Sequence, residues 1–291
     1  IRDAQESRGL GDVYKRQSFS CSNDDEVVAS RVAPTSQSRS VAICSAPSSL
    51  KSWGVTMTEL TAKLIEELQT IDTPTVCNAL EVVAPERRGY GYTTLPLVCT
   101  RPELRPMVGV ARTATIRSAH PSSLKGKEAG QLNDGYYAYV DEGPKPSIIV
   151  IQDLDDGQRG YGSFWGEVNS NVHKGLGALG VITDGSVRDL PDAAEGFQMM
   201  ADRVGPSHAY VHLVGFGQPI TVAGMRVMSG DLIHADLHGA VTIPWDVADK
   251  VLAAAQDIAA SEAVIISASQ EPGFNIDRLR RAWGESAELK H

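Results

Sequence analysis

Residues 147–189, SIIVIQDLDDGQRGYGSFWGEVNSNVHKGLGALGVITDGSVRD, decide the fold, because two apolar runs in them flank a glycine-rich loop and a helical stretch. The run at 147–155 is continuous, which is typical of a strand buried on both faces of a sheet. Residues 166–180 are predicted to form a helix with a glycine-rich exit, and GVITDG at 180–185 a second buried strand. The order strand, helix, strand predicts an α/β fold, with a central sheet that contains parallel strands and is flanked by helices.

Further helices and strands are predicted on both sides of this unit. Apolar side chains recur at helical spacing near residue 60, at Leu60, Leu64, Ile65 and Leu68. In DTPTVCNALEVV, at 72–83, Thr73 is predicted to cap a helix and Pro74 to take its first position. The other predicted helices are 128–143, 189–197, 245–265 and 275–285, and the other predicted strands are 107–119, 209–215, 219–236 and 239–244.

The first 17 residues are interpreted as a non-native segment. Residues 12–17, DVYKRQ, are encoded by the codons GAT GTG TAT AAG AGA CAG, and this string resembles a transposon adapter used in DNA library preparation, read as protein. The alternative is a genuine basic tail. We therefore leave residues 1–17 out of the fold prediction, as for any added segment.

Residues 18–56 are rich in Ser, Ala and Val and show no sustained hydrophobic period. A Ser-rich stretch can mimic a transit peptide, but the three acidic residues at 24–26 argue against that interpretation. The segment is predicted to be a disordered or non-native tail. Met57 opens an amphipathic helix, so we expect residues 57–291 to form a single α/β domain with C-terminal helices.

The charge balance favours a small-molecule substrate over nucleic acid or a membrane. The chain has 27 Lys and Arg and 36 Asp and Glu; residues 1–56 hold seven and six of these, so 20 and 30 remain, a net charge of −10. Proteins that bind nucleic acid directly usually carry a basic footprint instead. No apolar run in this part approaches the ~18 residues of a membrane span. Its two cysteines, Cys77 and Cys99, are spaced neither as a zinc site nor as a disulfide framework, so the cytoplasm is the expected compartment.

The stretch GLGALG at 175–180 matches the G-x-G-x-x-G pattern of dinucleotide-binding loops. That fingerprint follows a strand and opens a helix, whereas these glycines follow a predicted helix and precede a predicted strand. They are interpreted as a helix C-cap and a tight turn, so no nicotinamide or flavin cofactor is expected.

The predicted strand at 180–185 runs directly into SVRD, which places Arg188 and Asp189 at its carboxyl end. Ligands of open α/β sheets bind outside the carboxyl ends of the strands. The planar guanidinium of Arg188 matches a substrate carboxylate, and Asp189 offers a hard oxygen for Mg²⁺ or Mn²⁺. The alternative is a strand-end turn that carries only a local salt bridge.

The other predicted strand, 147–155, leads through a glycine-rich loop to Gly166 and Glu167 at the start of the helix. The first amide groups of a helix have no intrahelical partner and favour an anion. Gly166 lets a ligand come close to the backbone, and Glu167 can face the same pocket or can merely complement the helix dipole. Two adjacent strand ends therefore predict a site for a small carboxylate substrate bound to a divalent metal.

Three segments, WGEVN, GVITDGSVRD and GDLIHADLHGAVTIP, resemble the RraA-like family, which includes 4-hydroxy-4-methyl-2-oxoglutarate aldolases. With weaker matches in DTPTVCNAL and VGVARTATI, the resemblance spans about residues 73–244 and implies a swivelling β/β/α-type domain. The acid-x20-Arg-Asp-x2-acid spacing of the family's aldolases is met here, with Glu in place of Asp at the first position, by Glu167, Arg188, Asp189 and Asp192. Members that regulate ribonucleases can lack the acid after Arg, so Asp189 favours an enzyme.

The resemblance implies a class II pyruvate aldolase with oxaloacetate decarboxylase activity that depends on Mg²⁺ or Mn²⁺. By this resemblance the pyruvyl carboxylate and keto oxygen are bound by Gly166, Glu167, Val168, Asn169 and Arg188. Asp189 would ligate the metal directly, and Glu167 and Asp192 would hold its waters, so Arg188, Glu167 and Asp192 are the expected catalytic residues. A divalent ion at the keto oxygen and the cation of Arg188 would both stabilise a pyruvate enolate.

The alternative function is a non-catalytic regulator that binds a ribonuclease or helicase. The family also implies a homotrimer or homohexamer, in which the long C-terminal helix carries an acid such as Glu262 into a neighbouring subunit's site.

Four further polar residues receive a structural or pocket-lining interpretation. His234, Asp236 and His238 alternate in HADLHGA, so on a strand they face one way, as a polar wall or as a ligand set. His173 on the helix after Glu167 is expected to be packed or exposed rather than catalytic.

Overall fold

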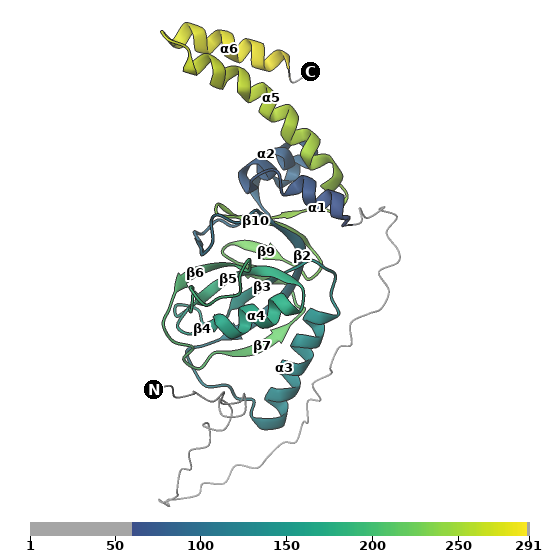
Figure 1. Ribbon diagram of the computed structural model, residues 1–291, viewed down its shortest axis with the longest axis vertical. Helices are drawn as coiled ribbons and strands as arrows, with labels where there is room; N and C mark the ends of the chain where they lie inside the picture. The colour runs from purple at the N-terminus through teal and green to yellow at the C-terminus, as the bar shows by residue number, and fades with distance from the viewer. Residues whose placement is uncertain (1–59, 290–291) are drawn as a thin grey trace, which may run out of the picture. The chain divides into compact units, whose positions relative to one another are not determined.

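The computed structural model describes residues 60–289, so the predictions for residues 1–17 and 18–56 and for a start at Met57 lie outside the described residues. Figure 1 shows a curled mixed sheet with helices packed around it. The helices are α1 (Ala62–Leu68), α2 (Thr73–Val83), α3 (Gly126–Asp141), α4 (Glu167–Gly175), α5 (Val251–Gln270) and α6 (Ile276–Glu288), with short 3-10 turns η2 (Pro85–Gly89) and η3 (Ala248–Lys250).

The central sheet has the strand order β1-β6-β5-β3-β2-β10-β11, with β4 paired to β5 and β7 paired to β2. Five strands, β2, β3, β4, β5 and β6, run parallel to one another, and β1, β7, β10 and β11 are antiparallel to their neighbours. The strands are β1 (Val98–Cys99), β2 (Met107–Arg117), β3 (Ser147–Asp153), β4 (Ser163–Trp165), β5 (Ala178–Val187), β6 (Gln198–Val204), β7 (His212–Phe216), β10 (Leu232–Asp236) and β11 (Gly239–Ile243), and a separate hairpin is formed by β8 (Ile220–Val222) and β9 (Met225–Val227).

Strand β3 is buried on both faces, as its continuous apolar run predicts. Ile149 and Ile151 belong to a core that α3 and the segment before α4 close, with Tyr136, Val140 and Trp165. Ile148 and Val150 point the opposite way, into a second core closed by the β8–β9 hairpin. Because successive side chains of a strand alternate between its faces, only an uninterrupted apolar sequence can fill both cores.

A third core lies where α1, α2 and the start of α5 pack against β2, β10 and β11. The predicted cap of α2 is wrong by one residue: the N-cap is Asp72, whose carboxylate accepts a hydrogen bond from the amide of Thr75 at 2.8 Å. Thr73 is buried and is used elsewhere, because its amide donates to Asp236 at 2.9 Å and its hydroxyl lies 3.0 Å from Nδ1 of His234. Pro74 is accordingly the second residue of α2 rather than the predicted first, because the helix begins at Thr73.

The residues predicted to form a polar wall in HADLHGA join β10 to the N-terminal helices. His234 is fully buried, and its Nε2 lies 3.1 Å from the carbonyl oxygens of both Leu68 and Ile71, so this nitrogen carries the proton. Burial lowers the pKa of His234 and keeps the ring neutral. Asp236 accepts from α2, whereas His238 lies in the turn after β10 with its Nδ1 3.1 Å from Oδ1 of Asp236, and within residues 60–289 these side chains do not form one ligand set.

The C-terminal pair α5 and α6 packs on α2 through the first turns of α5, where Val251, Ala254 and Ala255 are buried. The sequence predicts no apolar run near the length of a membrane span, but by length and composition alone residues 248–270 are long and apolar enough to cross a membrane, and only 22% of the relevant window is buried within the protein. A single helix of this kind is a weak indication of a membrane span, since helices of soluble proteins pass the same test.

Two local predictions fail around residues 189–204. Residues 189–197 form a turn rather than the predicted short helix, because Asp189 and Gly196 have positive φ angles of 53° and 70° and Pro191 lies between them. Strand β6 has no counterpart among the predicted strands. Its buried part is only Gln198–Ala201, and the exposed end of QMMADRV hides the strand pattern.

Candidate functional site

The two predicted site segments lie side by side at one edge of the central sheet. Strands β3 and β5 are parallel neighbours, and β4 pairs with the end of β5. The amide of Arg188 donates to the carbonyl of Trp165 at 2.9 Å, which fixes the residue after β5 against the residue before Gly166. The prediction that two strand ends meet is therefore confirmed: one leads into α4 and the other carries Arg188 and Asp189.

Asp189 lies at the centre of this arrangement. Its backbone adopts the left-handed conformation, at φ 53°, which disfavours most L-residues but which Asp tolerates better than most. Its carboxylate oxygen Oδ2 lies 3.4 Å from the amide of Glu167, the first residue of α4, and 3.6 Å from Nε of Arg188. Non-glycine residues in this conformation concentrate at functional sites, where the surrounding structure over-determines them.

The carboxylate of Asp189 occupies the anion-favouring N-terminus of α4. A Cβ atom on Gly166 would lie 2.5 Å from Oδ2 of Asp189 and 3.2 Å from Cγ of Arg188, so the approach requires glycine at this position. The helix end that the sequence predicts as a ligand site is thus already shared by an internal carboxylate, and a substrate anion would bind beside Asp189 rather than in its place.

The other predicted residues of α4 differ in what their side chains can do. Glu167 and Val168 are exposed, and Val168 retains 67% of its accessible surface. The side chain of Asn169 is engaged within the protein, because it accepts from the hydroxyl of Tyr137 at 3.1 Å and donates to the carbonyl of Phe164. A contact from Asn169 to a substrate would therefore come from its backbone amide.

Asp192 lies on the turn that follows Asp189 and is exposed. Its amide donates to the carbonyl of Asp189 at 3.1 Å. The buried hydroxyl of Ser170 in α4 accepts from the amide of Ala194 at 2.9 Å, so this turn is tied to the helix. Asp192 is thus joined to Asp189 by a backbone hydrogen bond, and its turn is joined to α4 by the side chain of Ser170.

The donor set suits a divalent ion held mainly by water. Within residues 60–289, no three His, Cys, Asp or Glu side chains gather as a ligand set for one metal ion. Asp189 fits a direct ligand: its side chain is 33% exposed, and the shortest polar contact of its Oδ2 is the long 3.4 Å bond from Glu167. Mg²⁺ keeps several waters and commonly takes only one or two protein carboxylates, which matches this arrangement.

A buried histidine that the sequence left undecided holds α4 in place. His173 is fully buried; its Nδ1 lies 2.7 Å from the carbonyl of Asn169, and its Nε2 lies 2.8 Å from the hydroxyl of Tyr136 in α3. Nδ1 therefore carries the proton, and Nε2 accepts one from Tyr136. Burial lowers the pKa of His173 to about 4, so the ring is neutral at physiological pH and serves a structural role.

Three buried carboxylates, Asp153, Asp155 and Asp184, form a group beside the site that the sequence analysis did not single out. Oδ1 of Asp184 accepts from the amide of Asp153 at 2.8 Å. Burial raises the pKa of Asp184 to about 6. The signal that could have found them is the presence of acids at the ends of both apolar runs, in QDLD and ITDG.

His173 and Asp184 make the folding stability depend on pH in opposite directions. For His173 the folded pKa of about 4 lies below the ordinary 6.5, so its contribution is complete above pH 6.5 and is lost as the pH falls toward 4. For Asp184 the folded pKa of about 6 lies above the ordinary 3.8, so its contribution is complete below pH 3.8 and is lost as the pH rises through 6. The two contributions offset each other between these limits.

Replacement of Asp184 by Asn is therefore expected to steepen the dependence of stability on pH. Without the opposing carboxyl, the free energy of unfolding should rise with pH between 4 and 6 by up to about 1.4 kcal/mol per unit from His173. Urea unfolding of the wild type and the variant across this range measures both slopes. Equal slopes in the two proteins would contradict the assignment.

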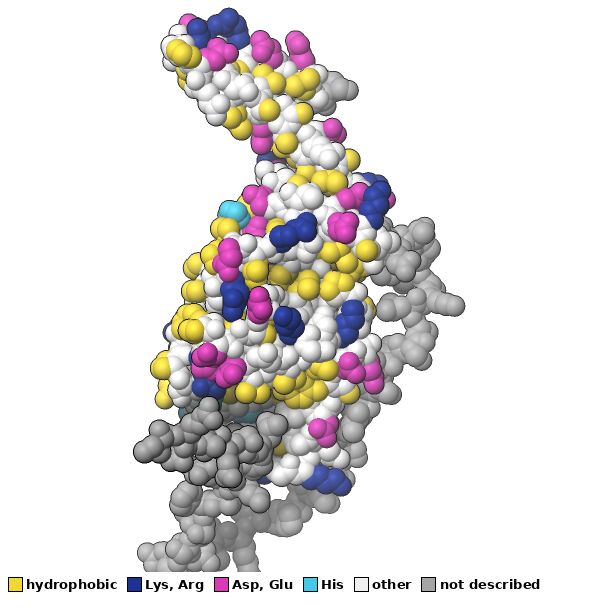
Figure 2. Space-filling view, in the orientation of Figure 1, with side chains coloured by type: hydrophobic (Ala, Val, Ile, Leu, Met, Phe, Trp, Pro, Cys, Tyr) yellow, Lys and Arg dark blue, Asp and Glu magenta, His cyan; other side chains and the backbone are white. Residues whose placement is uncertain are grey.

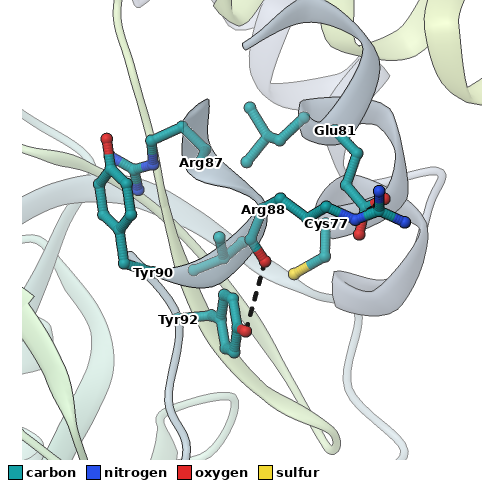
Figure 3. Close-up of a pocket in the computed structure, with 8 residues that line it drawn as sticks. Cys77, Glu81, Arg87, Arg88, Tyr90 and Tyr92 are labelled. Atoms are coloured by element: carbon teal, nitrogen blue, oxygen red, sulfur yellow. Dashed lines mark hydrogen bonds and ion pairs between the residues drawn. The ribbon is translucent and has the colours of Figure 1, made fainter. Parts of the chain in front are cut away.

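A separate cavity of about 130 Å³ lies between α2, η2 and β11, and Figure 3 shows its lining. Arg88 pairs with Glu81 at 3.1 Å there, and the guanidinium of Arg87 lies 4.9 Å from the centre of the Tyr90 ring. Burial raises the pKa of the Cys77 thiol to about 11, so this cysteine is protonated at pH 7 and is a poor nucleophile. No lining residue belongs to β4, α4 or β5, so the cavity is not part of the candidate site.

The face of the described residues drawn in Figure 2 carries mixed charges. On the face drawn in Figure 2, acidic and apolar side chains separate the Lys and Arg side chains of residues 60–289, which do not merge into a continuous basic surface. This distribution is unlike the basic footprint of proteins that bind nucleic acid directly.

Solved structures share this fold at low sequence identity. An uncharacterized protein from Pseudomonas syringae pv. tomato str. DC3000 is 22% identical, with a TM-score of 0.58, and the match covers 77% of this chain and 96% of that one. RraAS2 from Streptomyces coelicolor, described as an unusual member of the RNase ES inhibitor RraA protein family, is 21% identical, with a TM-score of 0.54 and coverage of 70% and 95%. A structure described under novel cellulases from gut-associated microbes is 19% identical, with a TM-score of 0.57 and coverage of 74% and 90%.

No curated protein matches the chain in sequence. A family model does match: the one described as RraA-like, Aldolase/RraA, covers residues 73–242, which include the whole candidate site and end before α5. Because this match takes in more than half of the 291 residues, the chain belongs to the RraA-like family.

Proposed function

We propose that the protein is a divalent-metal-dependent lyase that cleaves 4-hydroxy-4-methyl-2-oxoglutarate-like substrates to pyruvate and also decarboxylates oxaloacetate. The RraA-like family includes both aldolases and RraA-type regulators, so family membership alone does not choose between them. The observation that carries the proposal is Asp189: a partly exposed carboxylate, in a left-handed backbone conformation, placed between Arg188 and the N-terminus of α4.

Some residues of the site would bind the substrate, and others would hold the metal ion that stabilises charge. Arg188, which is 36% exposed, would bind the substrate carboxylate, and the first amides of α4 would add hydrogen-bond donors beside it. Asp189 would hold Mg²⁺ or Mn²⁺ directly, and the exposed carboxylates of Glu167 and Asp192 would hold its waters. Bound there, the ion would supply positive charge at the keto oxygen of the substrate.

The cation of Arg188 matters most as the carbon–carbon bond breaks and negative charge develops. Decarboxylation of oxaloacetate releases CO₂ and leaves an electron pair on the pyruvyl carbon, which delocalises onto the keto oxygen and is then quenched by a proton to give pyruvate. Aldol cleavage leaves the same enolate after the substrate hydroxyl has lost its proton. A fixed guanidinium costs no reorganisation when this charge appears, so it lowers the barrier.

The same proposal includes a cytoplasmic homotrimer or homohexamer, in which Glu262 of α5 would enter a neighbouring subunit's site. In its support, α5 beyond its first turns is buried only at Ser261, and apolar side chains on this helical pair are about half exposed, Ile266 at 53% and Trp283 at 52%. Sedimentation of the purified protein measures the assembly, and a monomer at micromolar concentration would contradict it.

The proposed activity is tested by pyruvate release from oxaloacetate in the presence of Mg²⁺ or Mn²⁺, with EDTA and a protein-free sample as controls because oxaloacetate also decays by itself. We expect release that is saturable, needs the metal and returns when metal is restored. A panel of 4-substituted 4-hydroxy-2-oxo acids then identifies the aldol substrate. A non-catalytic regulator that binds a ribonuclease or helicase would show no release above the protein-free rate with any of these acids.

A further inference from the structure

Residues 154–162 connect β3 to β4 and so lead directly into the candidate site. Asp153, the last residue of β3, is fully buried and holds the two ends of this segment together. One oxygen of Asp153 accepts from the amide of Asp155 at 3.0 Å, and the other accepts from the amide of Gly160 at 2.8 Å. Gly160 adopts a φ of 72°, a conformation that glycine adopts without strain.

Asp184, on the neighbouring strand β5, also binds this segment. Its Oδ1 accepts from the amide of Asp153, and its Oδ2 forms an ion pair with Nη1 of Arg159 at 3.5 Å. That distance is too long and poorly aligned for a good hydrogen bond, and Oδ2 has no other partner within residues 60–289. With only 6% of the Asp184 side chain exposed, Arg159 supplies the opposite charge that this buried carboxylate needs.

The charged groups around Asp184 have other partners. Asp155 pairs with Arg117 at 3.1 Å and accepts from the amide of Ala119 at 2.9 Å, at the end of β2. Asp156 binds Arg159 at 3.0 Å, but it lies within the connecting segment itself and its side chain is 91% exposed. Asp184 is therefore the acid that joins Arg159 to the sheet.

We propose that Asp184 and Arg159 are positioning residues of the site and that their ion pair fixes the connecting segment, and with it the N-terminus of α4, relative to Arg188. The topology supports this role, because Asp184 lies four residues before Arg188 on the same chain segment, whereas Arg159 lies eight residues before Glu167. One contact thus spans the two halves of the site. Its catalytic consequence rests on the function proposed above, but its structural consequence does not.

The test compares Asp184→Asn with Asp156→Asn. Asp184→Asn keeps an acceptor for the amide of Asp153 but removes the buried negative charge that faces Arg159. Asp156→Asn removes the exposed negative charge that pairs with the same arginine. Hydrogen exchange followed by mass spectrometry measures protection of residues 154–165. We expect Asp184→Asn to lower this protection on the order of tenfold, since charge-assisted contacts are worth about that factor, and Asp156→Asn to leave it within about twofold.

Steady-state decarboxylation provides the second readout. For a positioning role we expect Asp184→Asn to raise KM for oxaloacetate by about fivefold or more with a smaller change in kcat, because the binding amides of α4 are displaced while Arg188 remains. Arg159→Met, which removes the other partner, should reproduce both effects and replaces Asp184→Asn if that variant does not fold. Unchanged protection and unchanged KM in the folded variants would overturn the proposal. If the wild type shows no metal-dependent turnover, the proposed function fails, and the exchange measurement still decides the positioning role.

Discussion

Asp189→Asn is expected to lower metal-dependent release of pyruvate from oxaloacetate by at least about a hundredfold while the protein stays folded. Asn has the same shape as Asp and is among the residues that tolerate the left-handed conformation found here at φ 53°, so the turn should persist. Only the negative charge is lost, and with it the direct metal ligand. Initial rates across a series of Mg²⁺ concentrations, together with thermal unfolding, measure the two consequences separately.

The same carboxylate can be displaced sterically without changing any charge. At Gly166→Ala the new Cβ would lie 2.5 Å from Oδ2 of Asp189, although the extended backbone at Gly166, φ −167°, suits any residue. We expect a loss of activity on the order of tenfold from this variant. Gly175→Ala is the matched control in the same helix: its Cβ meets no atom within 4 Å, so activity should be retained. Near-normal turnover in both Asp189→Asn and Gly166→Ala would show that Asp189 is not the ligand.

The parts of the fold that the sequence predicts well are those whose signal is local. The apolar run of β3 fills two cores at once, and glycines 175–180 end α4 and lead into β5. The turn at 189–197 differs from the predicted helix because Asp189 has a positive φ angle; Asp tolerates this conformation better than most residues, but that tolerance alone does not predict that it is adopted here. Strand β6 was missed because pairing with β5, rather than its own pattern, makes it a strand.

In the candidate site, too, the features with a local sequence signal were predicted and those that depend on distant contacts were not. The pairing of Glu167 with Arg188 and Asp189 followed from the rule that ligands bind outside the carboxyl ends of parallel strands. The burial of Asp184 and its contact with Arg159 did not, because an acid at the end of an apolar run marks the position but does not indicate whether the side chain is buried or which cation it meets. Likewise, the buried role of His173 depends on Tyr136, which lies 37 positions away on another helix. Long-range contacts of this kind have no signature within a short stretch of sequence.

Arg188→Lys is expected to lower the rate of decarboxylation about a hundredfold and the stability by less than ~1 kcal/mol. The guanidinium can bind a carboxylate oxygen and the developing enolate oxygen at once through its planar donors, whereas an ammonium offers one point charge on a flexible chain. The stability cost is small because the side chain is 36% exposed and its ion contact with Asp189 is long, at 3.6 Å. The backbone bond from the amide of Arg188 to Trp165 does not depend on the side chain and is retained.

Arg203→Lys is the matched control for this prediction. Arg203 lies near the end of β6, the next parallel strand of the same sheet, and its side chain is 59% exposed and paired with Asp202. A general effect of replacing Arg at this edge of the sheet would appear in both variants, whereas a catalytic role predicts a loss of kcat in Arg188→Lys alone. Full turnover by folded Arg188→Lys would make Arg188 a structural residue of the turn. The site would then retain Asp189 and the N-terminus of α4 but would lose one of the two positive charges proposed to stabilise a pyruvate enolate.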